Sequence, residues 1–217
     1  VGPIREALRR YCVPDKASEG PYSITSLYLD NPGRQLYFDT QVRAPRRFKL
    51  RIRTYGTGRH YLEIKRRVKN IVSKSRVALP EGAWPQVFHD SRCIDELQLD
   101  DSERATLEEF VSRTLAIGAQ PAALVRYRRE AWNSTADDYA RVTFDSKLES
   151  GVPEGWHVPH EDGPRWRPVD SARHFGLPAS GVVLELKCTM SVPFWMTDIV
   201  GRFGLRRSGF SKYCGAV

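Results

Sequence analysis

The sequence predicts an α+β fold, in which an antiparallel β-sheet closes into a barrel and helices pack outside it. Three observations predict this fold. Several segments alternate between ionic and apolar residues, Gly and Asn lie between segments where hairpins turn, and the ionic positions are mostly Arg and Lys. Because consecutive side chains of a strand point to opposite faces, each such segment has one apolar and one basic face.

The predicted strands are the segments that carry β-branched and aromatic residues at alternate positions. Hairpin turns are expected at Gly56-Thr-Gly58 and at Asn70. The expected strands are Tyr22–Asp30, Arg46–Tyr55, His60–Lys69, Ile71–Leu79, Ala122–Trp132, Tyr139–Glu149 and Gly181–Thr189.

Helices are expected at three places beside these strands. A short helix covers Pro3–Tyr11. Two helical pieces lie within Trp84–Ala116, the second of which opens at Ser102, and another short helix covers Pro193–Phe203. The stretch Gly151–Ser180, rich in Pro, Gly and Trp, is predicted to be a long loop.

Length and composition predict one domain over residues 1–217, since 217 residues of which 41% are hydrophobic can bury a core. The 34 Lys and Arg exceed the 26 Asp and Glu, and the net charge of +8 favours a polyanionic partner: nucleic acid, an anionic membrane or a phosphate compound. No apolar stretch approaches the roughly 20 residues of a membrane span. Scattered cysteines and an opening without a secretory signal pattern predict a cytoplasmic location.

The basic strand faces are the most informative feature. In Phe48–Arg53, the side chains of Lys49, Arg51 and Arg53 share one face and apolar residues share the other. The same alternation groups Glu63, Lys65 and Arg67; Lys74 and Arg76; Tyr127 and Arg129; Arg141, Thr143 and Asp145; and Glu185 and Lys187.

Two interpretations of this pattern compete. An ordinary sheet with a solvated charged face is the commoner cause of alternation, and it would make Glu63 and Asp145 simple counter-charges. However, solvated faces usually carry charges of both signs together with uncharged polar residues. These faces instead hold mainly Arg and Lys, which repel one another across neighbouring strands. A barrel with a cationic interior and a polyanionic ligand explains the pattern better.

Seven motifs of the sequence resemble those of a known family. They are YSITSLYLD from Tyr22, FKLRIRTYG from Phe48, LEIKRR from Leu62, VRYRREAW from Val125, RVTFD from Arg141, LELK from Leu184 and FSKY from Phe210. In this order, over nearly the whole chain, they resemble the VTC (vacuolar transporter chaperone) polyphosphate polymerase domain of the CYTH-like triphosphate tunnel metalloenzyme superfamily.

The resemblance implies a tunnel that holds ATP or polyphosphate together with Mn²⁺ or Mg²⁺. Glu185 would be the metal ligand, Tyr127 a hydrogen-bond donor, and Ser211 a residue that closes on the phosphate chain at one mouth. The cations expected to be catalytic are Lys65, Lys187 and Lys212. The cations expected to bind phosphate or ATP are Lys49, Arg51, Arg53, Arg67, Lys74, Arg76, Arg129 and Arg141.

Family members usually begin with a strand carrying a Glu-x-Lys motif, and none precedes Val1, so truncation of that first strand is expected. Three functions remain open: a polyphosphate polymerase that uses ATP, a hydrolase of tripolyphosphate or nucleoside triphosphates, and a non-catalytic polyphosphate-binding module. Nucleic acid ranks last as a partner, because the aromatic residues form no stacking platform for bases. A membrane-protein partner and the oligomeric state stay open.

Overall fold

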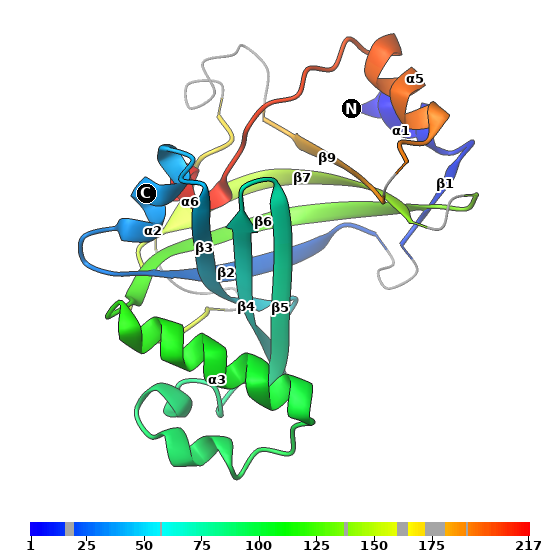
Figure 1. Ribbon diagram of the computed structural model, residues 1–217. Coiled ribbons are helices and arrows are strands. Elements are labelled where there is room, and N and C mark those ends of the chain that lie inside the picture. The colour runs from blue at the N-terminus through cyan, green and yellow to red at the C-terminus, as the bar shows by residue number, and fades with distance from the viewer. Residues whose placement is uncertain (16–19, 57, 137–138, 160–164, 172–180, 190) are drawn as a thin grey trace. The chain divides into compact units, whose positions relative to one another are not determined.

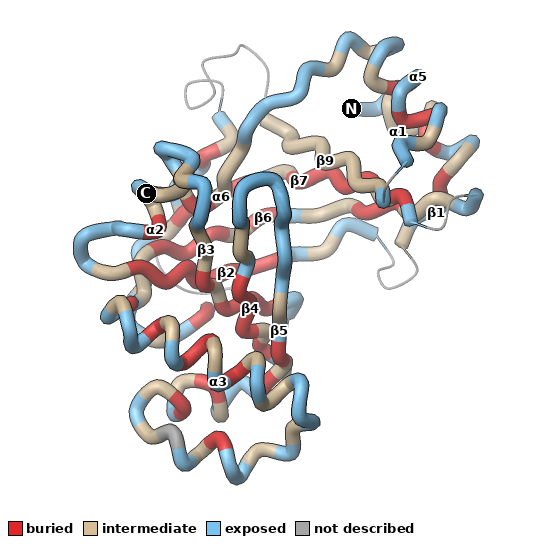
Figure 2. Tube along the Cα trace, in the orientation of Figure 1, coloured by how far each residue is buried: buried red, intermediate tan, exposed pale blue. Residues whose placement is uncertain are grey.

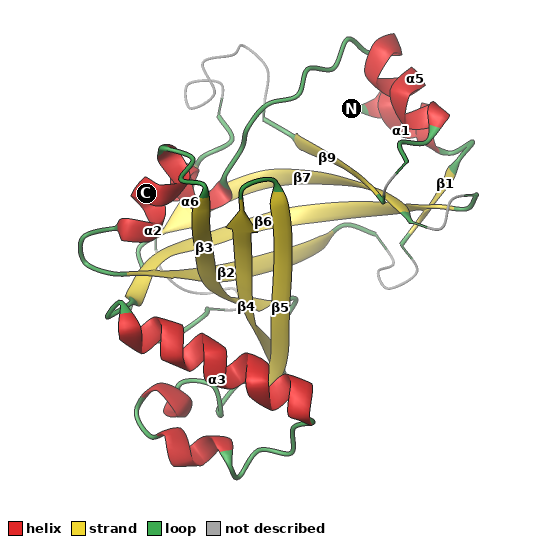
Figure 3. Ribbon diagram, in the orientation of Figure 1, coloured by secondary structure: helices red, strands yellow, loops and turns green. Residues whose placement is uncertain are grey.

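The computed structural model describes residues 1–15, 20–56, 58–136, 139–159, 165–171, 181–189 and 191–217 (Figure 1). It contains a large antiparallel sheet and several helices, which confirms the predicted α+β class (Figure 3). The chain forms two compact units, described separately below. The first comprises Val1–Ser23, Tyr127–Leu148 and Pro168–Phe210, and the second comprises Ile24–Arg126, Glu149–Arg167 and Ser211–Val217.

The second unit is built on antiparallel strands whose predicted bounds differ by at most one residue at each end. They are β2 (Tyr22–Asp30), β3 (Arg46–Thr54), β4 (Arg59–Val68) and β5 (Ile71–Pro80), each hydrogen-bonded to the next. Lys69 and Asn70 form the turn between the last two, so that Val68 lies opposite Ile71. This register fixes which side chains share a face.

The apolar face of these strands packs against α3 (Asp101–Ala116). Leu50, Ile52 and Leu62 of the strands are fully buried in one cluster with Phe110 of the helix. Figure 2 shows buried stretches on these strands and on α3. The helix begins one residue before the predicted Ser102, because a capping box stabilises its start. Within that box, Asp100 accepts a hydrogen bond from the backbone N–H of Glu103, whose side chain accepts one in return from the Asp100 backbone. The first helical piece is two 3₁₀ turns, η1 (Gln86–Phe88) and η2 (Ser91–Ile94).

The first unit contains α1 (Gly2–Leu8), β1 (Cys12–Pro14), β9 (Val183–Cys188), α5 (Phe194–Arg202) and parts of β6 (Gln120–Ser134) and β7 (Ala140–Gly151). Strand β1 pairs with β6, and β9 pairs with β7, both antiparallel. Trp195 and Met196 of α5 are buried with Leu8 of α1 and with Val142 and Phe144 of β7. The apolar sides of two short helices thus cover one face of these strands.

The predicted closed barrel is not confirmed. Among the described residues the strand order is β5-β4-β3-β2-β6-β7-β8, where β8 is Arg167–Pro168, with β1 on β6 and β9 on β7, so the order does not return to its start. Alternation specifies the two faces of each strand but not the partners of the edge strands, which is why it did not predict this outcome. Within the predicted loop Gly151–Ser180, residues 160–164 and 172–180 lie outside the described residues, and Arg167–Pro168 form β8.

Besides β8, the described residues contain short elements that were not predicted, namely β1, α2 (Gln35–Gln41) and α6 (Lys212–Ala216). The start of α2 is held by Asp30, whose carboxylate accepts hydrogen bonds from the backbone N–H groups of Leu36 and Tyr37. This capping residue lies at the end of β2, outside the position where sequence rules look for a cap. Over the described residues, no helix has both the length and the apolar character that crossing a membrane requires.

Candidate functional site

The register of β2 to β5 gathers the predicted cations of the second unit on the face opposite the core. Lys49 lies opposite Lys65, which lies opposite Lys74; in the next row Arg51 lies opposite Glu63. We call this side the basic face, and its cations are Arg47, Lys49, Arg51, Arg53, Lys65, Arg67, Lys74 and Arg76. Successive rows are about 7 Å apart along the strands.

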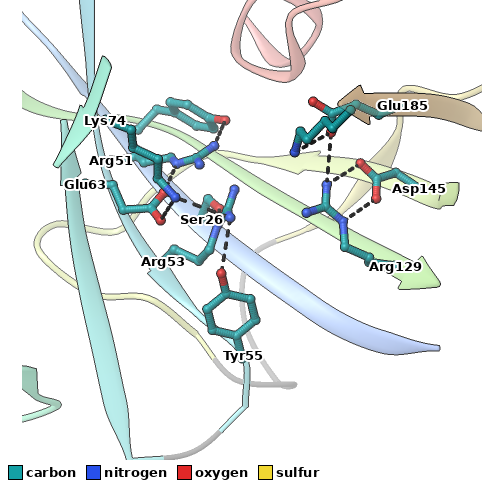
Figure 4. A network of polar contacts seen from close by, with 11 residues as sticks. Ser26, Arg51, Arg53, Tyr55, Glu63, Lys74, Arg129, Asp145 and Glu185 are labelled. Atoms are coloured by element: carbon teal, nitrogen blue, oxygen red, sulfur yellow. Dashed lines mark hydrogen bonds and ion pairs between the residues drawn. The ribbon is translucent and has the colours of Figure 1, made fainter. Parts of the chain in front are cut away.

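Glu63 is the carboxylate at the centre of the basic face, and its side chain is 0% exposed. One carboxylate oxygen accepts a hydrogen bond from Nε of Arg51 and lies 3.9 Å from Nη1 of Arg53. The other oxygen lies 2.7 Å from Nζ of Lys74 (Figure 4). Two neighbouring strands, β3 and β5, thus direct three cations at one buried carboxylate, the arrangement expected of a counter-charge.

Burial on its own raises the pKa of the Glu63 carboxyl, but the charges of Arg51 and Arg53 and the contact with Lys74 outweigh it and lower the pKa to about 2. The group is therefore ionised in the folded protein at any ordinary pH. Its negative charge offsets only part of the positive charge around it.

Acid stability should depend on this carboxylate. The unfolded chain binds the proton near pH 4.5 and the folded chain near pH 2, so the contribution is complete above about pH 4.5 and is lost as the pH falls to about 2. At about 1.4 kcal/mol per pKa unit it amounts to about 3 kcal/mol. Denaturant unfolding across this range should give a shallower pH slope for Glu63→Gln than for the wild type; equal slopes would contradict the assignment.

Tyrosine hydroxyls border the basic face. The Tyr28 hydroxyl accepts a hydrogen bond from Nη1 of Arg51, and the Tyr55 hydroxyl accepts one from Nη1 of Arg53, each at 3.3 Å. Burial raises the pKa of both phenols, but the nearby cations outweigh it, so both pKa values lie below the usual range. The phenol oxygens therefore face a net positive potential, which also acts on any anion placed there.

The segment Ser211–Val217 packs beside Lys49. Nζ of Lys49 donates to Oγ of Ser211 at 2.7 Å, and burial lowers the pKa of that amine. The ring of Tyr213 stacks on Tyr28 with centroids 5.1 Å apart, and its hydroxyl donates to Asp30 at 2.6 Å. The predicted Ser211 therefore contacts one of the predicted cations.

A second ionic cluster lies in the first unit, which we call the Arg129 cluster. Both Asp145 oxygens accept hydrogen bonds from Arg129, at 2.7 and 2.8 Å, and a Glu185 oxygen lies 3.8 Å from the same guanidinium. Lys187 lies 3.2 Å from Glu185, and burial lowers its pKa despite that neighbour. Figure 4 labels Arg129, Asp145 and Glu185. Pairing of β7 with β9 also sets Arg141 opposite Lys187.

The two carboxylates of the Arg129 cluster differ in access. Asp145 is 0% exposed and both of its oxygens are occupied by Arg129, whereas the Glu185 side chain is 41% exposed. Asp145 therefore acts as a counter-charge to Arg129, which is the role that the solvated-sheet interpretation of the sequence gives it. In the part of the chain that is described, no three His, Cys, Asp or Glu residues come together as a metal site. A cation at Glu185 would need most of its ligands from elsewhere.

The structure thus places the predicted residues in two groups. The basic face and its neighbouring C-terminal segment contain the cations of β3 to β5, Ser211 and the half-buried Lys212. The Arg129 cluster contains Glu185, Lys187 and Arg141, which also donates to Asp15 at 2.6 Å. Tyr127 is 1% exposed beneath the Arg129 guanidinium, 5.4 Å from it, so the predicted donor lies in the core.

Sequence reasoning missed the polar residues of β2, Ser26 and Tyr28, which lie opposite Arg53 and Arg51. The alternation of YSITSLYLD carried this signal, because Leu27 and Leu29 occupy the other face. It also missed Asp15, which binds Arg141, and the pair Asp30 and Tyr213, because these contacts span more than 100 residues and leave no local pattern.

Comparison with models of known protein families gives a match over nearly the whole chain. The family model described as the VTC domain matches residues 2–217. No curated protein matches the chain. Among solved structures, the PH1819 protein from Pyrococcus Horikoshii OT3 is 13% identical over 73% of this chain and 69% of its own, with a TM-score of 0.37, a value at which likeness does not define a fold.

Proposed function

Because the chain belongs to the VTC domain family, part of the CYTH-like tunnel fold family, we propose that it is a polyphosphate polymerase. In the proposed reaction, an oxygen at the end of a polyphosphate chain attacks the terminal phosphorus of ATP. The bond to the bridging oxygen breaks, ADP leaves and the chain grows by one phosphate. Family membership supports a function related to polyphosphate polymerisation; the reaction and its substrates are our proposal.

The observation that carries the proposal is the imbalance of charge on the basic face. Eight cations share it, and Glu63 stands among them in direct contact with three. Like charges opposite one another on neighbouring strands destabilise a sheet. An anion with many oxygens, spaced along the strands, relieves this repulsion at every row, and a chain of phosphates has that form.

The residue types suit the transfer of a phosphoryl group. The forked guanidinium groups of Arg51 and Arg53 match pairs of phosphate oxygens, and Lys49, Lys65 and Lys74 supply movable point charges. Phosphoryl transfer depends on positioning and on neutralising charge more than on covalent help from the protein. We assign these five cations to holding the triphosphate of ATP in line with the end of the acceptor chain.

Glu185 fits a divalent cation that binds together with phosphate. Mg²⁺ is commonly held by one or two carboxylates, substrate phosphate oxygens and water, and Mn²⁺ prefers the same oxygen ligands, so one accessible carboxylate is sufficient. When bound at Glu185, such a cation would neutralise charge on a phosphate group beside it. Lys187 beside Glu185 would contact oxygens of that phosphate group, and Asp145 would keep Arg129 in place.

The test is product analysis. The protein is incubated with ATP and either Mn²⁺ or Mg²⁺, and the products are separated on a gel stained for polyphosphate, with free phosphate assayed in parallel. A ladder of polymer supports the polymerase. Free phosphate without polymer would identify the hydrolase, and bound ATP without turnover would identify a binding module.

Glu185→Gln should reduce metal-dependent turnover by about 10²–10³-fold, because a bound metal ion stabilises the transition-state charge by several kcal/mol. Glu149→Gln is the matched control, since Glu149 is also a strand carboxylate paired with an arginine, Arg126, at 2.7 Å. Initial rates measured against metal concentration give the comparison. Equal losses in the two variants, or full activity of Glu185→Gln, would remove Glu185 from the site.

A further inference from the structure

The basic face continues beyond the rows assigned to the triphosphate. Arg47 lies directly opposite Arg67, two residues along the strands from the pair Lys49 and Lys65. This spacing places the Arg47 row about 7 Å further along β3 and β4. Lys69 follows in the adjoining turn, and its backbone N–H donates to Pro45, which brings the start of β3 beside the turn.

Arg43, Arg47, Arg67 and Lys69 form a group that we call the tip cations. Arg43 and Lys69 are exposed and Arg47 and Arg67 are half-buried, and Figure 2 shows that the adjoining end of the β4–β5 hairpin is exposed. The Arg47 guanidinium donates to the carbonyl of Ala44 at 2.6 Å, and that of Arg67 to the carbonyl of Lys69 at 2.9 Å. These carbonyl partners orient the side chains but are uncharged, so they leave the repulsion in place.

The charge environment of Arg47 reflects this repulsion. Burial, Arg67 and Arg43 lower its pKa, in that order, and only Asp39 acts in the opposite direction. Arg66, on the other face of β4, shows the alternative arrangement: it forms an ion pair with Glu109, which also binds Arg113 at 2.7 Å. The core side of the strand thus gives its arginine a carboxylate, whereas the tip cations accumulate beside one another.

We propose that the tip cations form an extension subsite for the phosphates of a polyphosphate chain beyond the triphosphate. This inference rests on the proposed function, because the polyphosphate must first occupy the rows of Lys49 and Arg51. Polyphosphate fits better than a single-stranded nucleic acid. The exposed apolar residues of the adjoining β4–β5 hairpin, Val68, Ile71 and Val72, are aliphatic and offer no ring on which a base could stack.

The subsite makes affinity depend on chain length. Tripolyphosphate occupies only the rows assigned to the triphosphate. Because successive rows are about 7 Å apart, a chain of roughly 15 phosphates is long enough to reach the tip cations as well. The wild type should bind the long chain more tightly. The double variant Arg43→Gln/Arg47→Gln should weaken binding of the long chain by about tenfold or more and change that of tripolyphosphate by less than twofold.

The experiment is titration calorimetry of the full chain with both ligands at one ionic strength, since exposed charges are sensitive to salt. Arg9→Gln/Arg10→Gln is the matched control, because it removes two charges at the end of α1. Melting temperatures establish that both variants are folded. The subsite is supported if the Kd for tripolyphosphate divided by the Kd for the long chain falls in the tip variant and is unchanged in the control.

The other outcomes separate the two proposals. If tripolyphosphate does not bind the wild type, the proposed function fails. If tripolyphosphate binds but the ratio of Kd values is the same in all three proteins, or if both ligands weaken equally in the tip variant, the extension subsite is wrong. An RNA oligonucleotide of matched charge that depends on Arg43 and Arg47 as strongly as polyphosphate does would overturn the assignment to polyphosphate.

Discussion

The double variant Arg51→Ala/Arg53→Ala is expected to lose about 10²–10⁴-fold in affinity for tripolyphosphate, because each charge-assisted hydrogen bond contributes about 1.5–3 kcal/mol. The two guanidinium groups lie on one face of β3, and both have an exposed fraction below one fifth. Low exposure strengthens their interaction with an anion, since screening by water is weaker there. Titration calorimetry at fixed ionic strength gives the two Kd values.

Two further variants make this result interpretable. Arg92→Ala/Arg128→Ala removes the same charge from exposed positions and should change the Kd by less than threefold at about 0.15 M salt. Arg51→Lys/Arg53→Lys keeps the charge but loses the fork, and its affinity should lie between those of the wild type and the alanine variant. An unchanged Kd in the alanine variant would favour the ordinary solvated sheet instead.

The strands and their faces were predictable because alternation is a local property. In Phe48–Arg53 each residue's face follows from its neighbours, and the turn at Asn70 sets Lys65 opposite Lys74. From these two facts the sequence places most cations of the basic face on one side. The pairing of the edge strands does not follow from any such local rule, so no local pattern supports the prediction of a closed barrel.

The part of the site that could not be predicted depends on distant contacts. Asp30 binds the hydroxyl of Tyr213, 183 residues away, and in this way it holds the segment that presents Ser211 to Lys49. Neither residue stands out in its own segment. Likewise, alternation places Glu63 on the basic face, but its contact with three cations from two neighbouring strands emerges only from the register.

Glu63→Gln should have two effects of opposite sign. The buried carboxylate is 0% exposed and compensates Arg51, Arg53 and Lys74, so removal of its charge should lower the free energy of unfolding by about 3–5 kcal/mol. The same change removes the anion that competes with phosphate for these cations. The affinity for tripolyphosphate should therefore rise roughly tenfold or more.

Ligand binding links the two effects. Tripolyphosphate at 100 times its Kd should restore about 2.7 kcal/mol of the lost stability, since a ligand that binds only the folded state stabilises it by mass action. Glu109→Gln is the control, because Glu109 also contacts two arginines but lies on the core side of β4 and is 35% exposed. That variant should lose about 1 kcal/mol or less and leave the Kd unchanged. A Glu63→Gln variant that is destabilised yet binds tripolyphosphate no more tightly than the wild type would show that Glu63 stabilises the sheet without competing with phosphate, and the basic face would then not be the phosphate site.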